Sequence, residues 1–155
     1  MNKKALNILF LGGAKRVSLA EKFMDEGKES GISINIFSYE LDTDVPISLV
    51  GEIIRGLGWN DSNLYNHLIE IIAKKQIDII IPFLDYATIV AARLKEMTGN
   101  MNVFIPVSDN NVCELFFNKY FADEWCMENG VSAPSKCGKF PLIAKPIHGL
   151  SLIHI

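Results

Sequence analysis

The sequence has few cysteines, the residues that stabilise many small proteins through disulfide bonds or bound zinc. Only three cysteines occur among 155 residues, Cys113, Cys126 and Cys137. They lie more than ten residues apart and form no CxxC or CxxH pairing, which excludes a disulfide framework and a cysteine-rich zinc site. We therefore predict reduced, mostly packed thiols and a cytoplasmic protein.

Basic residues are not in excess either. Fifteen lysines and arginines stand against eighteen acidic residues, for a net charge of −3, so a nucleic-acid partner is not expected. No uninterrupted apolar run approaches the ~18 residues of a membrane span. The run Ala5–Leu11 follows two lysines but reaches Gly12-Gly13 without a cleavage site, which argues against a signal peptide.

What the sequence does contain is an ordinary globular composition. Hydrophobic residues make up 49% and charged residues 21%, which excludes a disordered chain. A chain of 155 residues is long enough for a substantial core and for one domain, or one domain plus a fragment.

Apolar periodicity predicts alternating strands and helices. Residues 41–60 read as a loop with room for one short strand, because glycine and proline interrupt them. The alternation predicts a Rossmann-like parallel sheet with helices on both faces, over a domain of residues 1–106. The expected strands are 5–11, 32–40, 78–82 and 103–105, and the expected helices run from Val17 to Gly31, from Asp61 or Ser62 to Lys75, and from Tyr86 to Met97, with Asp85 as a cap.

A second region, residues 107–155, has a different pattern. We expect Ser108 to cap a short helix, and a longer helix over about 118–129 to end at Gly130. A last apolar strand is predicted at Pro141–Pro146. Phe116, Phe117, Tyr120, Phe121 and Trp125 recur at helical spacing; with few basic residues among them, they indicate a packing surface rather than a base-stacking platform.

Ligands of open parallel sheets bind at the carboxyl ends of the strands. The loop after the first predicted strand contains Gly12, Gly13, Lys15 and Arg16, which suits an anionic substrate at a helix amino end. A tight turn that merely connects strand and helix is the alternative. Asp85 is a second candidate for substrate binding, with helix capping as its alternative.

Glu40, at the end of the second predicted strand, has two interpretations. It either holds a ribose hydroxyl, as in NAD-binding folds, or is a solvated loop carboxylate. The glycine fingerprint of dinucleotide binding is incomplete, because Ala14 and Val17 stand where its later glycines would fall.

Histidines are scarce, and none has a recognisable chemical partner in the sequence. We expect His67 on the solvent side of its helix, away from Leu64 and Leu68. His148 and His154 have no acid or nucleophile at a telling spacing. No catalytic triad and no metal site is predicted.

Three segments together resemble the opening of an ATP-grasp domain: Asn118-Lys119-Tyr120, residues 128–134, and Phe140–Pro146 with Gly149. With the Rossmann-like first part, including Ile79–Asp85, the whole chain is similar to the amino-terminal, pre-ATP-grasp portion of ATP-grasp ligases. The carbamoyl-phosphate-synthase-like group is the most similar in pattern.

The resemblance implies a role for two lysines. Lys145 and Lys119 would contact the phosphates of ATP, since a mobile ammonium can follow shifting negative charge. In this family ATP activates a small carboxylate as an acyl phosphate, with Mg held by acidic residues. Those acids, the adenine-binding segment and a glycine-rich lid would lie beyond Ile155, so we expect a truncated chain that is inactive and binds neither ATP nor Mg by itself.

The ending departs from the family pattern. Leu150, Leu152, Ile153 and Ile155 stand where a flexible loop of small residues is expected, which favours an interrupted reading frame over a natural short protein. The main hypothesis is a substrate-positioning module of an ATP-dependent carboxylate ligase. The alternatives are a non-catalytic interaction module, homodimeric through an exposed boundary, and an NAD-binding Rossmann domain resting on Gly12, Gly13 and Glu40.

Overall fold

The computed structural model describes residues 5–132 and 146–148. The chain divides into two compact units, residues 1–107 and 108–155. The first unit contains β1 (Ala5–Leu11), α1 (Val17–Glu29), β2 (Ser33–Glu40), the 3-10 helix η1 (Pro46–Leu49), β3 (Glu52–Arg55), α2 (Leu64–Lys75), β4 (Ile79–Pro82) and α3 (Asp85–Met97). The second contains α4 (Asn110–Phe117) and α5 (Lys119–Glu128).

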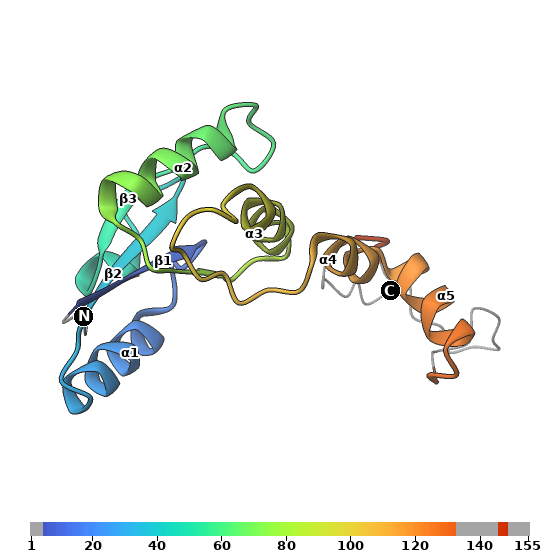
Figure 1. The fold of residues 1–155 in the computed structure, drawn as a ribbon, viewed down its shortest axis with the longest axis horizontal. Coiled ribbons are helices and arrows are strands. Elements are labelled where there is room, and N and C mark those ends of the chain that lie inside the picture. Colours follow the sequence, from blue (N-terminus) through green and yellow to red (C-terminus); the bar gives the residue numbers. More distant parts are fainter. Residues whose placement is uncertain (1–4, 133–145, 149–155) are drawn as a thin grey trace. The chain divides into compact units, whose positions relative to one another are not determined.

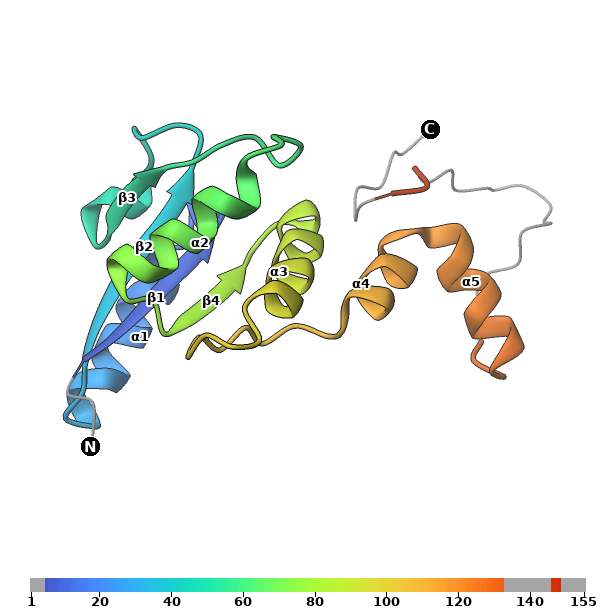
Figure 2. The same ribbon diagram turned by 45° about the horizontal axis from the view of Figure 1, so that its top comes forward.

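The first unit is built on a parallel sheet with the strand order β3-β2-β1-β4. Figure 1 labels β3, β2 and β1 of this sheet, and Figure 2 labels β4 as well. β1 pairs along its whole length with β2 and over its second half with β4. This central position explains why β1 is apolar at successive positions, since a strand covered on both faces buries every side chain. The predicted strand at residues 5–11 is confirmed.

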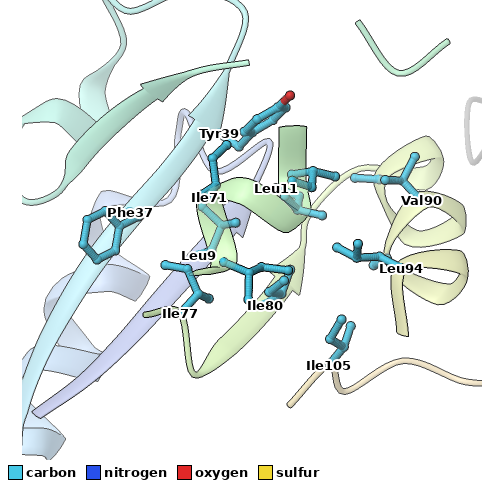
Figure 3. Packing of buried hydrophobic residues seen from close by; sticks show 14 of the residues in the cluster. Leu9, Leu11, Phe37, Tyr39, Ile71, Ile77, Ile80, Val90, Leu94 and Ile105 are labelled. Carbon is cyan, nitrogen blue, oxygen red and sulfur yellow. The ribbon is translucent and has the colours of Figure 1, made fainter. Parts of the chain in front are cut away.

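Helices cover the two faces of this sheet separately (Figure 2). On one face α2 and α3 enclose the larger core, in which Leu9 and Leu11 of β1 meet the apolar sides of both helices. On the other face α1 and η1 pack against Ile8 and Phe10 of the same strand. Figure 3 shows the larger core, with Tyr39 at its margin and the Tyr39 hydroxyl directed away from the aliphatic side chains.

The predicted helix caps are wrong at three positions. Asn63 rather than Asp61 or Ser62 is the N-cap of α2, and Asp61 instead accepts the Asn63 amide through Oδ1 at 2.8 Å. A carboxylate two residues ahead stabilises such a turn without capping the helix. The N-cap of α4 is Asp109 rather than the predicted Ser108.

Asp85 is likewise no cap, because α3 has Leu84 at its N-cap and begins with Asp85 itself. Leucine has no side-chain acceptor, whereas an acidic residue in the first turn favours the helix through its dipole.

Two short segments of the first unit were predicted only coarsely. Residues 41–60 contain η1 and the four-residue edge strand β3. The predicted strand 103–105 is reduced to a parallel bridge between Phe104 and Ile79, beside β4. The backbone of Phe104 both donates to Asp78 O at 2.7 Å and accepts from Ile80 N at 3.0 Å.

In the second unit, Asn118 separates the two helices. Its Oδ1 accepts the amides of Tyr120 and Phe121, which makes it the N-cap of α5. Gly130 follows the helix with φ +70°, the left-handed terminator that the sequence predicts. Cys113 and Cys126 are half-buried thiols, and Cys137 lies outside the described residues.

Candidate functional site

The carboxyl ends of the four parallel strands lie at one edge of the sheet. The segments that leave this edge are 12–16 after β1, 41–45 after β2, 56–63 after β3, and 83–84 after β4. This is the edge where open α/β sheets bind ligands, and it brings together Gly12, Gly13, Lys15, Arg16 and Asp85. Their role in binding stays a prediction.

Close packing explains both glycines of the β1–α1 turn. Gly12 has φ +75°, and a Cβ there would lie 2.5 Å from Leu84 Cδ1. A Cβ on Gly13 would lie 2.7 Å from Phe10 Cβ and 2.8 Å from Ser38 Oγ. The glycines therefore let the turn pack closely against β2 and the β4–α3 connection. This is a structural use, and the same lack of side chains would let a ligand approach the backbone.

Two cationic side chains stand at the amino end of α1. Lys15 and Arg16 are exposed, and Arg16 is the N-cap residue. The Arg16 guanidinium lies 5.4 Å from the centroid of the Phe83 ring, a cation–π contact that directs it toward the end of β4. First-turn amides have no carbonyl partner within a helix, so this corner can hold a small anion.

A buried carboxylate lies beside this corner. Glu40, the last residue of β2, is 9% exposed, and its Oε1 accepts a hydrogen bond from Ser38 Oγ at 2.6 Å. The interpretation of Glu40 as a solvated loop carboxylate is therefore wrong. Ser38 and Glu40 are two residues apart on one strand, so both lie on the α1 face of the sheet. This two-residue spacing is visible in the sequence.

Strand register adds Arg55 to the same edge. Arg55, the last residue of β3, is the Cα partner of Glu40. Register partners in a parallel pair present their side chains to the same face, so the exposed Arg55 side chain belongs to the α1 face too. The edge thus offers both anionic and cationic groups to a ligand.

On the opposite face, His67 corrects another expectation. It is half-buried rather than exposed, and its Nδ1 lies 2.9 Å from the hydroxyl of Tyr39. His67 follows Leu64 by three residues, which puts it at the border of the apolar stripe rather than opposite to it. Burial raises the pKa of Tyr39, and the charge of Asp61 adds to this, against the lowering effect of the Leu57 amide.

Of the two lysines that the family resemblance singles out, only Lys119 lies within the described residues. Its Nζ donates to Pro146 O at 2.9 Å, and its backbone amide donates to Ile147 O at 2.8 Å. Lys119 thereby ties the start of α5 to residues 146–147. Lys145 lies outside the described residues.

The aromatic residues of α4 and α5 remain at the surface. Phe116 and Trp125 meet at 5.4 Å in an edge-to-face pair, and Phe117 stacks on His148 at 5.4 Å. Phe116, Tyr120, Phe121 and Trp125 are each more than a third exposed. A hydrogen bond to Glu124, together with the charge of that carboxylate, raises the pKa of Tyr120. His154 lies outside the described residues.

Within residues 5–132 and 146–148, no three histidine, cysteine, aspartate or glutamate side chains converge as metal ligands would. Of the helices in this part of the chain, none combines the length and apolar character of a membrane span.

Comparison with known proteins gives a likeness in structure only. Neither a family model nor a curated protein matches the sequence. The biotin carboxylase domain of a single-chain bacterial carboxylase matches with a TM-score of 0.57 and 16% identity, over 88% of this chain and 32% of its own.

Two further solved structures match as well. The Staphylococcus aureus N5-carboxyaminoimidazole synthetase complexed with ADP gives a TM-score of 0.54 and 16% identity, over 83% and 30% of the two chains. The biotin carboxylase domain dimer of Hydrogenobacter thermophilus 2-oxoglutarate carboxylase, with MgADP and bicarbonate, gives a TM-score of 0.55 and 15% identity, over 81% of this chain and 27% of its own.

These matches concern fold. The chain spans about a third or less of the length of each of these proteins. The predicted Rossmann-like parallel sheet with helices on both faces is confirmed, and the chain shares its fold with these structures. Except for Pro146, the predicted strand Pro141–Pro146 lies outside the described residues.

Proposed function

We propose that this chain is the amino-terminal, substrate-positioning module of an ATP-dependent carboxylate ligase of the ATP-grasp type. The observation that carries the proposal is the fold that it shares with carboxylase and synthetase structures holding ADP or bicarbonate. The finer assignment to the carbamoyl-phosphate-synthase-like group, and the domain boundary at residues 106–107, belong to the same proposal.

In this proposal the carboxyl edge of the sheet holds the carboxylate substrate. Lys15 and Arg16 supply positive charge at the amino end of α1, and the Phe83 ring restrains the guanidinium of Arg16. A guanidinium can bind a carboxylate through two parallel hydrogen bonds. Asp85 is half-buried in the first turn of α3, which begins at the same edge after the end of β4. Such fixed charges would orient the substrate for reaction.

ATP is assigned to the second unit. Lys119 and Lys145 would contact its phosphates, and the bond from Lys119 Nζ to Pro146 O brings that ammonium next to the residue that follows Lys145 in the chain. Bound ATP would supply the phosphoryl group that activates the carboxylate. We assign magnesium no ligand among the described residues, because none of their acidic side chains form a cluster suited to it.

Nuclear magnetic resonance titration of the ¹⁵N-labelled chain tests the substrate part. The probes are sodium bicarbonate, sodium acetate and L-glutamate, with NADH as a separate probe for the dinucleotide alternative. We expect saturable shifts of the amides of residues 13–19 with at least one carboxylate, at about millimolar affinity, which corresponds to roughly −4 kcal/mol.

Matched variants on one helix make the result specific. Lys15→Ala combined with Arg16→Ala should abolish the shifts. Lys22→Ala, which removes an exposed charge from the middle of α1, should leave them unchanged. Saturable shifts that survive the double variant, or their absence with every carboxylate, would contradict the proposed substrate site.

Calorimetric titration with MgATP tests the nucleotide part. We expect no micromolar binding by the 155-residue chain, since the proposal gives it two phosphate-binding lysines and no metal ligand. Micromolar affinity that disappears in Lys145→Ala would contradict this expectation and indicate a complete nucleotide site.

One observation favours the alternative function of an interaction module. The exposed aromatic side chains Phe116, Tyr120, Phe121 and Trp125 form a surface of the kind that binds other proteins. Sedimentation of the wild type and of Phe121→Ala/Trp125→Ala measures self-association. A dimer that the double variant dissociates would support this alternative, and a monomeric wild type would count against homodimerisation.

A further inference from the structure

The hydroxyl of Tyr39 joins three elements of the first unit. Tyr39 on β2 is 1% exposed. Its hydroxyl oxygen accepts the Leu57 amide at 2.8 Å and lies 2.9 Å from Nδ1 of His67 on α2. Leu57 belongs to the segment of residues 56–63 that connects β3 to α2.

The direction of these hydrogen bonds follows from the inventory of donors. The Leu57 amide can only donate, so the phenolic oxygen is its acceptor. The phenolic proton is buried and needs an acceptor of its own, and Nδ1 of His67 is placed to be it. With Nδ1 as the acceptor, the ring proton lies on Nε2.

Tyr39 also fixes the beginning of the 56–63 segment by contact. Gly56 lies against the Tyr39 ring so closely that a Cβ there would overlap ring carbons, and its amide donates to Glu40 O at 2.7 Å. The Trp59 ring lies 6.1 Å from the Tyr39 ring, centroid to centroid. Tyr39 thus contacts Gly56, Leu57 and Trp59 of this segment.

We propose that the Tyr39–His67 hydrogen bond is a pH-sensitive latch on the 56–63 segment. A protonated imidazole carries hydrogen on both nitrogens and has no lone pair to offer. The Tyr39 oxygen would then face two donors while its own proton lost its acceptor, a loss that is costly in a buried site. Opening of the segment takes up a proton, so the open population grows as pH falls.

The other charged groups near His67 come from three places. Glu52 on β3 and Glu70, Lys74 and Lys75 on α2 line, together with His67, a cavity of about 310 Å³. Lys75 Nζ bonds Glu52 at 2.7 Å, and Asp61 stands in the segment itself, where its charge acts on Tyr39. Histidine is the side-chain type whose charge ordinarily changes between pH 5 and 8, which sets the pH range in which the latch is tested.

The latch lies at the edge of the sheet assigned above to substrate. Segment 56–63 leaves that edge directly after Arg55, the Cα partner of Glu40. Its opening would change access to the β2 and β3 ends of the site. The latch itself does not depend on the proposed function, because it rests on contacts within the first unit.

Amide hydrogen exchange of the full chain, followed by nuclear magnetic resonance from pH 8 to pH 5, tests the latch. The readout is the protection factor of the Leu57 amide, which is corrected for the intrinsic pH dependence of exchange. We expect this factor to fall as His67 becomes protonated, by up to about tenfold per pH unit. The Leu9 amide, in the central strand, should stay protected throughout.

Two variants identify the titrating group. In His67→Asn the side-chain oxygen can accept from Tyr39 but cannot be protonated in this range, so Leu57 protection should no longer depend on pH. In Tyr39→Phe it should be low at every pH. A constant wild-type factor, the same fall in His67→Asn, or a parallel loss at Leu9 would overturn the proposal, and the first two outcomes decide it even if Tyr39→Phe does not fold.

Discussion

Asn7 of β1 holds the turn that follows α2, because its Nδ2 donates to the carbonyl oxygens of both Lys75, at 2.8 Å, and Gln76, at 3.1 Å. Its backbone amide donates a hydrogen bond to Oδ2 of Asp78 at 2.8 Å. The one polar residue inside the first apolar run is thus the residue that joins β1 to the start of β4.

Replacement of Asn7 tests this joint. We expect Asn7→Ala to lower the free energy of unfolding by about 1 kcal/mol, since two carbonyls lose a half-buried donor. Urea unfolding followed by Trp59 fluorescence in a Trp125→Phe background measures the first unit. Asn35→Ala is the control, because Asn35 donates only to Asn7 Oδ1 at an exposed position; equal losses in both variants would contradict the assignment.

Gln76 is the next target, because it ends α2 with φ +50°, a left-handed conformation that costs non-glycine residues energy. Gln76→Gly should raise the free energy of unfolding by up to about 1 kcal/mol, and Gln76→Val should lower it. The same urea unfolding experiment measures both changes. A glycine variant less stable than wild type would show that the Gln76 side chain contributes contacts of its own.

Gly13 and Gly31 should respond differently to alanine. A Cβ on Gly13 would meet Phe10 and Ser38, whereas a Cβ on Gly31 would meet nothing within 4 Å. We expect Gly13→Ala to cost about 1–3 kcal/mol through overpacking, and Gly31→Ala about 1 kcal/mol through its φ of +69° alone. Thermal unfolding of both variants provides the comparison, and a harmless Gly13→Ala would contradict the close packing of the β1–α1 turn.

Tyr39 predicts a loss of stability in alkali. Burial raises the pKa of Tyr39 in the folded chain above its ordinary value of 10.0, so the unfolded chain binds fewer protons once the pH exceeds that value. Stability contributed by the neutral phenol is therefore complete below about pH 10 and decreases as pH rises further. Urea unfolding at pH 8 and pH 11 should show a smaller decrease in Tyr39→Phe than in wild type; equal decreases would contradict the burial argument.

Much of the fold could be predicted from local patterns. The apolar run of β1, the stripe of Leu64, Leu68 and Ile71 in α2, and Gly130 after α5 are each visible within a few residues. Helix caps were predicted less well, because Asp61, Ser108 and their neighbours offer several competing side chains within one turn. Their choice depends on where the chain enters the helix.

The candidate site was predicted in part. Gly12, Gly13, Lys15 and Arg16 were named because they follow a strand, and their role in binding stays a prediction. The buried pair of Ser38 and Glu40 was not recognised. His67 was placed on the wrong side of its helix, since three-residue spacing from Leu64 leaves its direction open. The partner that decides it, Tyr39, is 28 residues away in the chain.

The sequence by itself determined where the longer strands and helices of this protein lie, and that the sheet is parallel, because hydrophobic periodicity and turn residues act over a few neighbouring positions. Only the tertiary structure decided which strand ends are neighbours. The order β3-β2-β1-β4 brings Arg55 beside Glu40 and His67 to Tyr39. Such contacts join residues from separate elements, and their energies depend on burial and distance, which no local pattern contains.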